Sequence, residues 1–90
     1  QAAALDGADF VYVKNWSSYH SYGKVLTKDP SWMMTPEKLG AARFMHCLPI
    51  RRNAVAADAV LDGGQSLVLQ QASNRTVAAQ LALLHMLEAL

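Results

Sequence analysis

Short apolar runs alternate with polar stretches along this chain, and three of these runs predict β-strands. Residues 9–16, DFVYVKNW, are aromatic and β-branched and contain no Gly or Pro, which is typical of a strand. Residues 43–48, RFMHCL, predict a second strand that stops at Pro49, and residues 66–71, SLVLQQ, predict a third. The nearly continuous apolar character of the first run favours a parallel strand covered on both faces.

Helical signals separate the predicted strands. Thr35 can cap a short helix over residues 35–43, and Pro36 suits its first position. Asn53 can cap a second helix over residues 54–62, which two glycines follow. Both helices are therefore expected to connect one strand to the next.

A final helix is expected to begin at Asn74 or Thr76 and to run to Leu90, with an apolar stripe of Val77, Leu81, Leu84 and Leu87. Residues 17–34 have no clear period and predict a long loop, a feature that is usually functional or disordered. Strands that alternate with helices predict an α/β fold, here a partial parallel sheet with flanking helices.

The chain contains more hydrophobic residues than a domain of its size is expected to bury. Ninety residues allow one small domain, and a chain of this size buries only about 60% of its unfolded surface. Yet 52% of the residues are hydrophobic, so we expect that further segments cover some apolar faces. A first residue of Gln1 rather than Met agrees with a piece of a longer protein.

Charge and cysteine content narrow the function classes. The net charge of +1 creates no strong field for nucleic acid or an anionic membrane. No run reaches the roughly 18 apolar residues that a membrane span needs. The single cysteine cannot form an internal disulfide, which favours a reducing compartment.

Candidate chemistry lies where the predicted strands end, because ligands of open α/β sheets bind beyond the carboxyl ends of the strands. Lys14 ends the first strand, Cys47 and Arg51 follow the second, and Arg75 follows the third near the start of the last helix. Three cations at one edge suit a substrate with several negative charges, since Arg can hold a carboxylate or phosphate through two parallel hydrogen bonds. At a helix start, Arg75 would also lie beside free N–H groups that favour an anion.

Simpler interpretations apply to the same residues. A lone cysteine between apolar residues is more often a small core residue, and adjacent arginines such as Arg51 and Arg52 are more often a solvated pair. His46 is expected to form a hydrogen bond at the sheet edge. The spacing of Cys47 and the histidines indicates no zinc site, and there is no P-loop, dinucleotide glycine motif or serine nucleophile elbow. These patterns alone indicate an anion-binding α/β unit.

One motif is more specific. His46-Cys47-Leu48-Pro49, followed by Arg51-Arg52-Asn53, resembles the hallmark of the ornithine-type carbamoyltransferases. The runs 8–16, 58–62 and 72–75 also resemble family segments, so the resemblance covers nearly the whole chain. Lys14-Asn15-Trp16 stands where ordinary ornithine carbamoyltransferases carry Ser-Met-Gly, which favours the branch that uses N-acetyl- or N-succinylornithine.

The resemblance implies an activity and a set of roles. The enzyme would transfer a carbamoyl group from carbamoyl phosphate to the δ-amine of an N-acylornithine in arginine biosynthesis, without cofactor or metal. Cys47 and Leu48 would be catalytic and would line the carbamoyl phosphate site, with Cys47 as a positioning group and not a covalent nucleophile. Arg75 would contact carbamoyl phosphate, Lys14 and Arg51 would bind the anionic end of the acylornithine, and the loop 17–34 would close over the substrate.

The resemblance also implies an organisation. Residues 1–75 would form the C-terminal part of the acylornithine-binding domain and residues 76–90 a C-terminal helix, without the N-terminal carbamoyl phosphate domain. Val55 stands where one type of N-acetylornithine enzyme has a carboxylated lysine, so the chain is more similar to the succinylornithine type. The complete protein would be a cytoplasmic homotrimer that shares its sites between subunits and binds neither nucleic acid nor membrane. An ornithine carbamoyltransferase and a non-catalytic anion-binding module are the alternatives.

Overall fold

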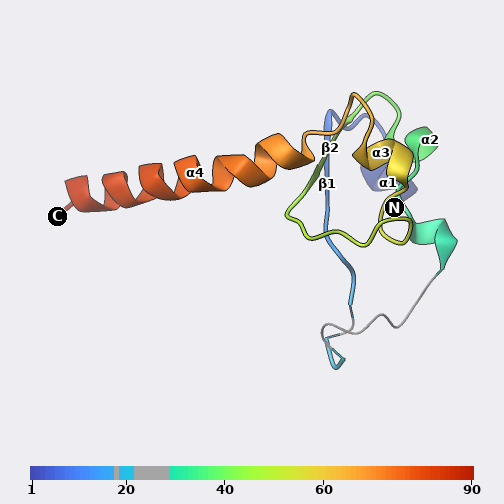
Figure 1. The fold of residues 1–90 in the computed structure, drawn as a ribbon, viewed down its shortest axis with the longest axis horizontal. Coiled ribbons are helices and arrows are strands. Elements are labelled where there is room, and N and C mark those ends of the chain that lie inside the picture. Colours follow the sequence, from blue (N-terminus) through green and yellow to red (C-terminus); the bar gives the residue numbers. More distant parts are fainter. Residues whose placement is uncertain (18, 22–28) are drawn as a thin grey trace.

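The computed structural model describes residues 1–17, 19–21 and 29–90. Two short parallel strands, β1 (Phe10–Val13) and β2 (Arg43–His46), form a two-stranded sheet, with Phe10 opposite Arg43 and Val13 opposite His46. Helices flank these strands, as Figure 1 shows. The predicted α/β class is therefore confirmed, and both strands fall inside the ranges predicted from the sequence.

The connection between the strands contains the predicted short helix. The 3-10 helix η1 (Pro30–Trp32) precedes α2 (Pro36–Leu39), and Thr35 caps α2 by accepting a hydrogen bond from the backbone N–H of Lys38. This cap confirms the role expected of Thr35. The loop predicted over residues 17–34 lies partly outside the described residues. A four-residue helix, α1 (Ala2–Leu5), precedes β1 and had no counterpart in the prediction.

The second predicted helix is shorter than expected. Helix α3 (Asp58–Leu61) begins after Ala57, so Asn53 is not its N-cap as expected. The Asn53 side chain nevertheless accepts a hydrogen bond from the backbone N–H of Asp58, at 3.0 Å, from a turn five residues earlier. Asn53 therefore satisfies a free N–H of α3 from outside the helix.

The predicted third strand at residues 66–71 is wrong. Ser66 alone forms a parallel bridge with Phe44, and the chain then enters helix α4 (Val68–Glu88). Leu and Gln are good helix formers, and only Val68 in this segment is β-branched, so little resists the helix once the chain has left the sheet. Helix α4 thus begins six to eight residues earlier than expected.

A small core lies between the sheet and the short helices. It consists of Val11, Met34, Leu39, Ala42, Phe44, Ala56, Val60 and Val68, with Phe44 fully buried at its centre. Only the first turn of α4 reaches this core. The rest of α4 extends away from the body (Figure 1), and its predicted apolar stripe, from Val77 to Leu87, is exposed. No helix in the described part of the chain is long and apolar enough to cross a membrane.

Candidate active site

The segment after β2 has an unusual backbone. Leu48 adopts a left-handed conformation with φ of 54°, and the Leu48–Pro49 peptide bond is cis. The backbone N–H of Leu48 donates to Nδ1 of His46 at 2.8 Å. Since this Nδ1 accepts, the proton of a neutral imidazole lies on Nε2. Burial lowers the pKa of His46, which favours this neutral form.

His46 itself is completely buried, and it forms the hydrogen bond expected of it at the end of β2. Its Nε2 atom has no hydrogen-bond partner among the described residues. Cys47, the next residue, is exposed, so it is not the small core residue of the simpler interpretation. The two adjacent residues therefore differ in environment: His46 is buried and accepts a hydrogen bond from the backbone of Leu48, whereas Cys47 is exposed.

The ends of the two strands are joined by hydrogen bonds. The Asn15 side chain donates to the carbonyl of Pro49 at 2.8 Å and accepts from the backbone N–H of Arg51 at 3.4 Å. The Arg51 guanidinium donates in turn to the carbonyl of Trp16 at 3.3 Å. The segments that follow β1 and β2 therefore lie side by side, as expected for the carboxyl ends of adjacent parallel strands.

A hollow of about 680 Å³ lies between the sheet, the segment after β2 and the first half of α4. Three of the site residues predicted from the sequence line it, namely Cys47, Leu48 and Arg75. Cys47 and Leu48 come from the strand end, and Arg75 comes from α4. The hollow thus brings together a thiol, a constrained backbone turn and a cation.

Two further lining residues, Tyr12 and Gln71, were not predicted. Partial burial raises the pKa of the Tyr12 phenol, hydrogen bonding to Cys47 raises it further, and a hydrogen bond with Gln71 lowers it. Tyr12 lies two residues before Lys14, and residues two apart in a strand share one face, so this spacing could have predicted Tyr12 as a further site residue. Gln71 lies one helical turn before Arg75, which becomes visible only when the start of α4 is known.

Arg75 lies in the interior of α4, so its predicted position at a helix start is wrong. The expected contribution of free helix N–H groups is therefore absent at this residue. Arg75 can still bind an anion through its own guanidinium, because it lines the same hollow as Cys47.

Lys14 and Arg51 occupy different surroundings. Lys14 is exposed and lines a second hollow of about 380 Å³, together with Trp16 and Trp32. The rings of these tryptophans meet edge to face, with centroids 6.3 Å apart. Arg51 lies at the joined strand ends and lines neither of these two hollows. Lys14 and Arg75 line different hollows, so the three cations do not form the one cluster that the sequence suggested.

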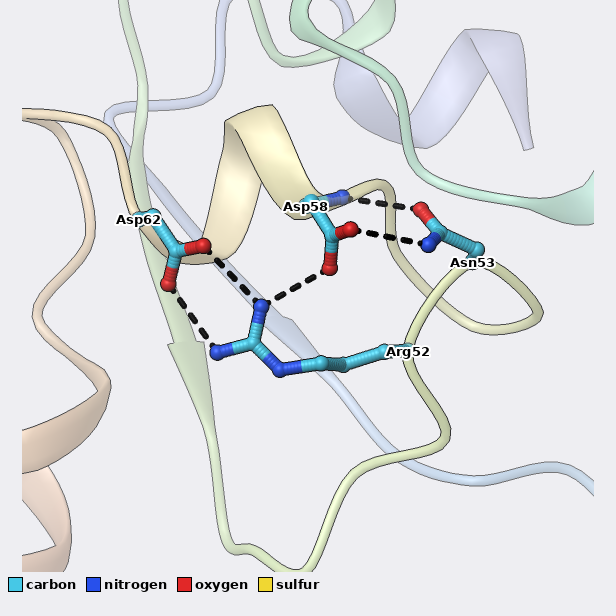
Figure 2. A network of polar contacts seen from close by, with 4 residues as sticks. All are labelled: Arg52, Asn53, Asp58 and Asp62. Atoms are coloured by element: carbon cyan, nitrogen blue, oxygen red, sulfur yellow. Dashed lines mark hydrogen bonds and ion pairs between the residues drawn. The ribbon is translucent and has the colours of Figure 1, made fainter.

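Arg52 makes the strongest charged contacts near the site. Its guanidinium pairs with Asp62 through two hydrogen bonds of 3.0 Å and with Asp58 at 2.8 Å (Figure 2). Hydrogen bonds from Arg52 lower the pKa of both carboxyl groups. Arg52 is therefore ion-paired with two carboxylates, while its side chain remains 53% exposed, in agreement with the simpler interpretation of a solvated arginine. Across residues 1–17, 19–21 and 29–90, no three His, Cys, Asp or Glu side chains gather where they could hold a metal ion.

The fold is an α/β unit with a hollow at the carboxyl ends of its parallel strands, the place where sheets of this kind bind ligands. A family model described as "Aspartate/ornithine carbamoyltransferase, Asp/Orn binding domain" matches residues 1–87. The chain therefore belongs to the aspartate/ornithine carbamoyltransferase family. This match confirms the resemblance noted in the motif around Cys47.

Individual relatives are similar over most of the chain. The N-succinylornithine carbamoyltransferase of Bacteroides thetaiotaomicron is 41% identical over 95 aligned residues, which cover 100% of this chain and 30% of that protein. The N-acetylornithine carbamoyltransferase of Xylella fastidiosa is 35% identical, covering 80% of this chain and 24% of that protein.

A crystal structure of acetylornithine transcarbamylase complexed with acetylcitrulline superposes with a TM-score of 0.65 and 32% identity, covering 82% of this chain and 25% of that one. The chain thus spans less than a third of the length of these relatives.

Proposed function

We propose that this chain forms part of the acylornithine-binding half of an enzyme that transfers a carbamoyl group from carbamoyl phosphate to the δ-amine of an N-acylornithine. The observation that carries the proposal is the meeting of Cys47, Leu48 and Arg75 in one hollow, in a chain of the carbamoyltransferase family. Cys47 and Arg75 are far apart in sequence, and they meet because α4 starts beside the end of β2.

The reaction makes demands that such a site can meet. The neutral δ-amine attacks the carbonyl carbon of carbamoyl phosphate, a C–N bond forms, and the C–O bond to phosphate breaks. The nitrogen then loses a proton, and phosphate departs with the electron pair of the broken bond. Preorganised donors must hold the reactants in line and stabilise the charge on the carbonyl oxygen and the leaving phosphate. We assign the phosphate contact to Arg75, and the neighbourhood of the reacting carbon to Cys47 and Leu48.

Lys14 and Arg51 would bind the anionic end of the acylornithine. The contact of Arg51 with the carbonyl of Trp16 supports this role, because it holds the guanidinium at the joined strand ends, two residues after Lys14. Lys14 precedes Asn15, which joins the two strand ends, and lines the second hollow.

The acyl group is most consistent with succinyl. The match to an N-succinylornithine carbamoyltransferase, 41% identical over 100% of this chain, supports this choice over the match to an N-acetylornithine enzyme, 35% identical over 80% of this chain. Val55, which would be a carboxylated lysine in one acetylornithine type, is buried and apolar here. The proposal also includes a cytoplasmic homotrimer that shares its sites between subunits and acts in arginine biosynthesis.

The test uses the complete protein, meaning the translation product that contains these 90 residues. Carbamoyl phosphate would be supplied with N-succinylornithine, N-acetylornithine, ornithine or putrescine, and the carbamoylated amine and phosphate would be quantified. We expect the highest kcat/KM with N-succinylornithine and little turnover of putrescine, which has the amine but no carboxylate. Preferred use of ornithine or putrescine would refute the assignment, and light scattering would check the trimer.

A further inference from the structure

The Arg52 network consists of Arg52, Asn53, Asp58 and Asp62, and it links the segment that follows β2 to helix α3 (Figure 2). Arg52 donates hydrogen bonds to Asp58 and Asp62. The next residue, Asn53, donates from its side chain to Oδ2 of Asp58 at 2.9 Å. The Asn53 oxygen accepts from the backbone N–H of Asp58. Asp58 is thus bound by the adjacent residues Arg52 and Asn53, and Asp62 accepts two parallel hydrogen bonds from the guanidinium of Arg52.

Adjacent arginines therefore lie on opposite sides of the chain. The Arg51 guanidinium contacts the carbonyl of Trp16 after β1, whereas the Arg52 guanidinium contacts the carboxylates of α3. The segment 47–52, which we call the site loop, is consequently fixed from two sides. Asn15 holds it toward β1 through the carbonyl of Pro49, and Arg52 holds it toward α3.

The backbone of the site loop depends on such support. Leu48 has φ of 54°, and Asn53, directly after the loop, has φ of 56°. This left-handed region is tolerated by Asn but is unfavourable for a bulky residue such as Leu. Conformations of this kind persist only where surrounding contacts determine them. The loop has these contacts at His46, at Asn15 and in the Arg52 network.

We propose that Arg52 is a positioning residue that orients Leu48 and Arg51 by fixing the site loop to α3. The inference rests on the proposed function, because Leu48 and Arg51 are assigned there to the site. Arg52 would touch no substrate, since its guanidinium is directed to Asp58 and Asp62. Arg51 would thus bind the substrate, and Arg52 would hold the site loop that carries Arg51.

The exposure of these side chains shows where the effect should appear. The Arg52, Asp58 and Asp62 side chains are 53%, 55% and 64% exposed, and single exposed ion pairs contribute little to stability. Global stability is therefore a poor measure of this contact. A misplacement of about 1 Å in a site can, in contrast, cost about 100-fold in rate, so kinetics is the sensitive measure.

The kinetic test compares Arg52→Gln with Arg43→Gln in the complete protein. Arg43 is an exposed arginine of β2 whose side chain donates to the carbonyl of Gly64 at 3.4 Å, away from the hollow. We expect Arg52→Gln to lower kcat/KM for the acylornithine about 10- to 100-fold, and to weaken carbamoyl phosphate less, because Arg75, which is assigned to its phosphate, lies on α4 outside the site loop. Arg52→Lys should recover only part of the loss, because an ammonium cannot reproduce a two-pronged contact with Asp62 and reach Asp58 as well.

A second measurement does not depend on activity. In hydrogen exchange followed by mass spectrometry, Arg52→Gln should speed exchange in peptides that cover residues 51–58, where the N–H groups of Asn53 and Val55 bond to Ala56 and Arg51. Arg43→Gln should leave these peptides unchanged.

The outcomes separate the possibilities. Faster exchange with unchanged kinetics, or equal weakening of both substrates, would overturn the positioning role. A wild-type protein without carbamoyl transfer would instead refute the proposed function, and the exchange data would still decide whether Arg52 fixes the site loop.

Discussion

Replacement of Arg51 and Lys14 is the sharpest test of how the acylornithine is bound. Arg51 is half-buried at the joined strand ends, where its guanidinium donates to the carbonyl of Trp16 and its backbone N–H to Asn15. Lys14 is exposed in a neighbouring hollow. If both cations bind the anionic end of the substrate, each alanine substitution should weaken the acylornithine and leave carbamoyl phosphate binding nearly intact.

The magnitude follows from the kind of contact. A hydrogen bond from a charged donor to a carboxylate contributes about 1.5 to 3 kcal/mol, which corresponds to about 10- to 150-fold in affinity. Arg51→Ala should fall in this range and should lose in addition the contact with the carbonyl of Trp16. Arg51→Lys should also bind poorly, because a point charge cannot reproduce two parallel hydrogen bonds.

Calorimetric titration of the complete protein can measure these losses without turnover. Carbamoyl phosphate would be titrated alone, and then an N-acylnorvaline, which lacks the δ-amine and cannot react. Arg43→Ala serves as the matched control, because it removes an exposed arginine outside the hollow. Equal weakening of both ligands by Arg51→Ala or Lys14→Ala would indicate a general electrostatic effect. Unchanged N-acylnorvaline affinity would exclude both residues from substrate binding.

Three further predictions concern Arg75, His46 and the isolated chain. Arg75→Ala should raise KM for carbamoyl phosphate or lower kcat, at a combined cost of about 2 to 4 kcal/mol, and steady-state kinetics within twofold of wild type would contradict its assignment. Burial lowers the pKa of His46 in the folded state, so at a pH below its ordinary pKa of 6.5 the unfolded state binds more protons than the folded state. The stability of the protein should therefore fall as the pH decreases through 6.5. Melting curves should show a smaller loss for His46→Asn, which keeps a hydrogen-bond acceptor and does not titrate. The 90 residues alone should associate and show no carbamoyl transfer, because the stripe of α4 from Val77 to Leu87 is exposed, and a monomer with a cooperative melting transition would refute this.

The sequence predicted those elements whose signals are local. The aromatic and β-branched run around Tyr12 gave β1, and Pro49 gave the end of β2. Thr35 followed by Pro36 gave the start of α2, because a hydroxyl cap and a proline act within one turn. These signals also placed Cys47 and Leu48 correctly at a strand end.

Features that depend on distant contacts could not be predicted. The ion pairs of Arg52 with Asp58 and Asp62 were not predicted, because they depend on how the segment after β2 lies against α3. The contact of Tyr12 with Cys47 depends on the register between β1 and β2, which no local pattern defines. The burial of His46 likewise depends on what packs over the sheet.

Arg75 shows why a site can survive a wrong secondary-structure prediction. The sequence suggested that a third strand carries the chain past β2 toward the carboxyl edge of the sheet. In the structure only Ser66 pairs with β2, but the pairing is parallel, so the chain passes Phe44 in the same direction. Helix α4 then continues from that point, and its first two turns bring Gln71 and Arg75 beside Cys47. The direction of the chain at one paired residue, and not the strand itself, therefore determines which side chains reach the hollow.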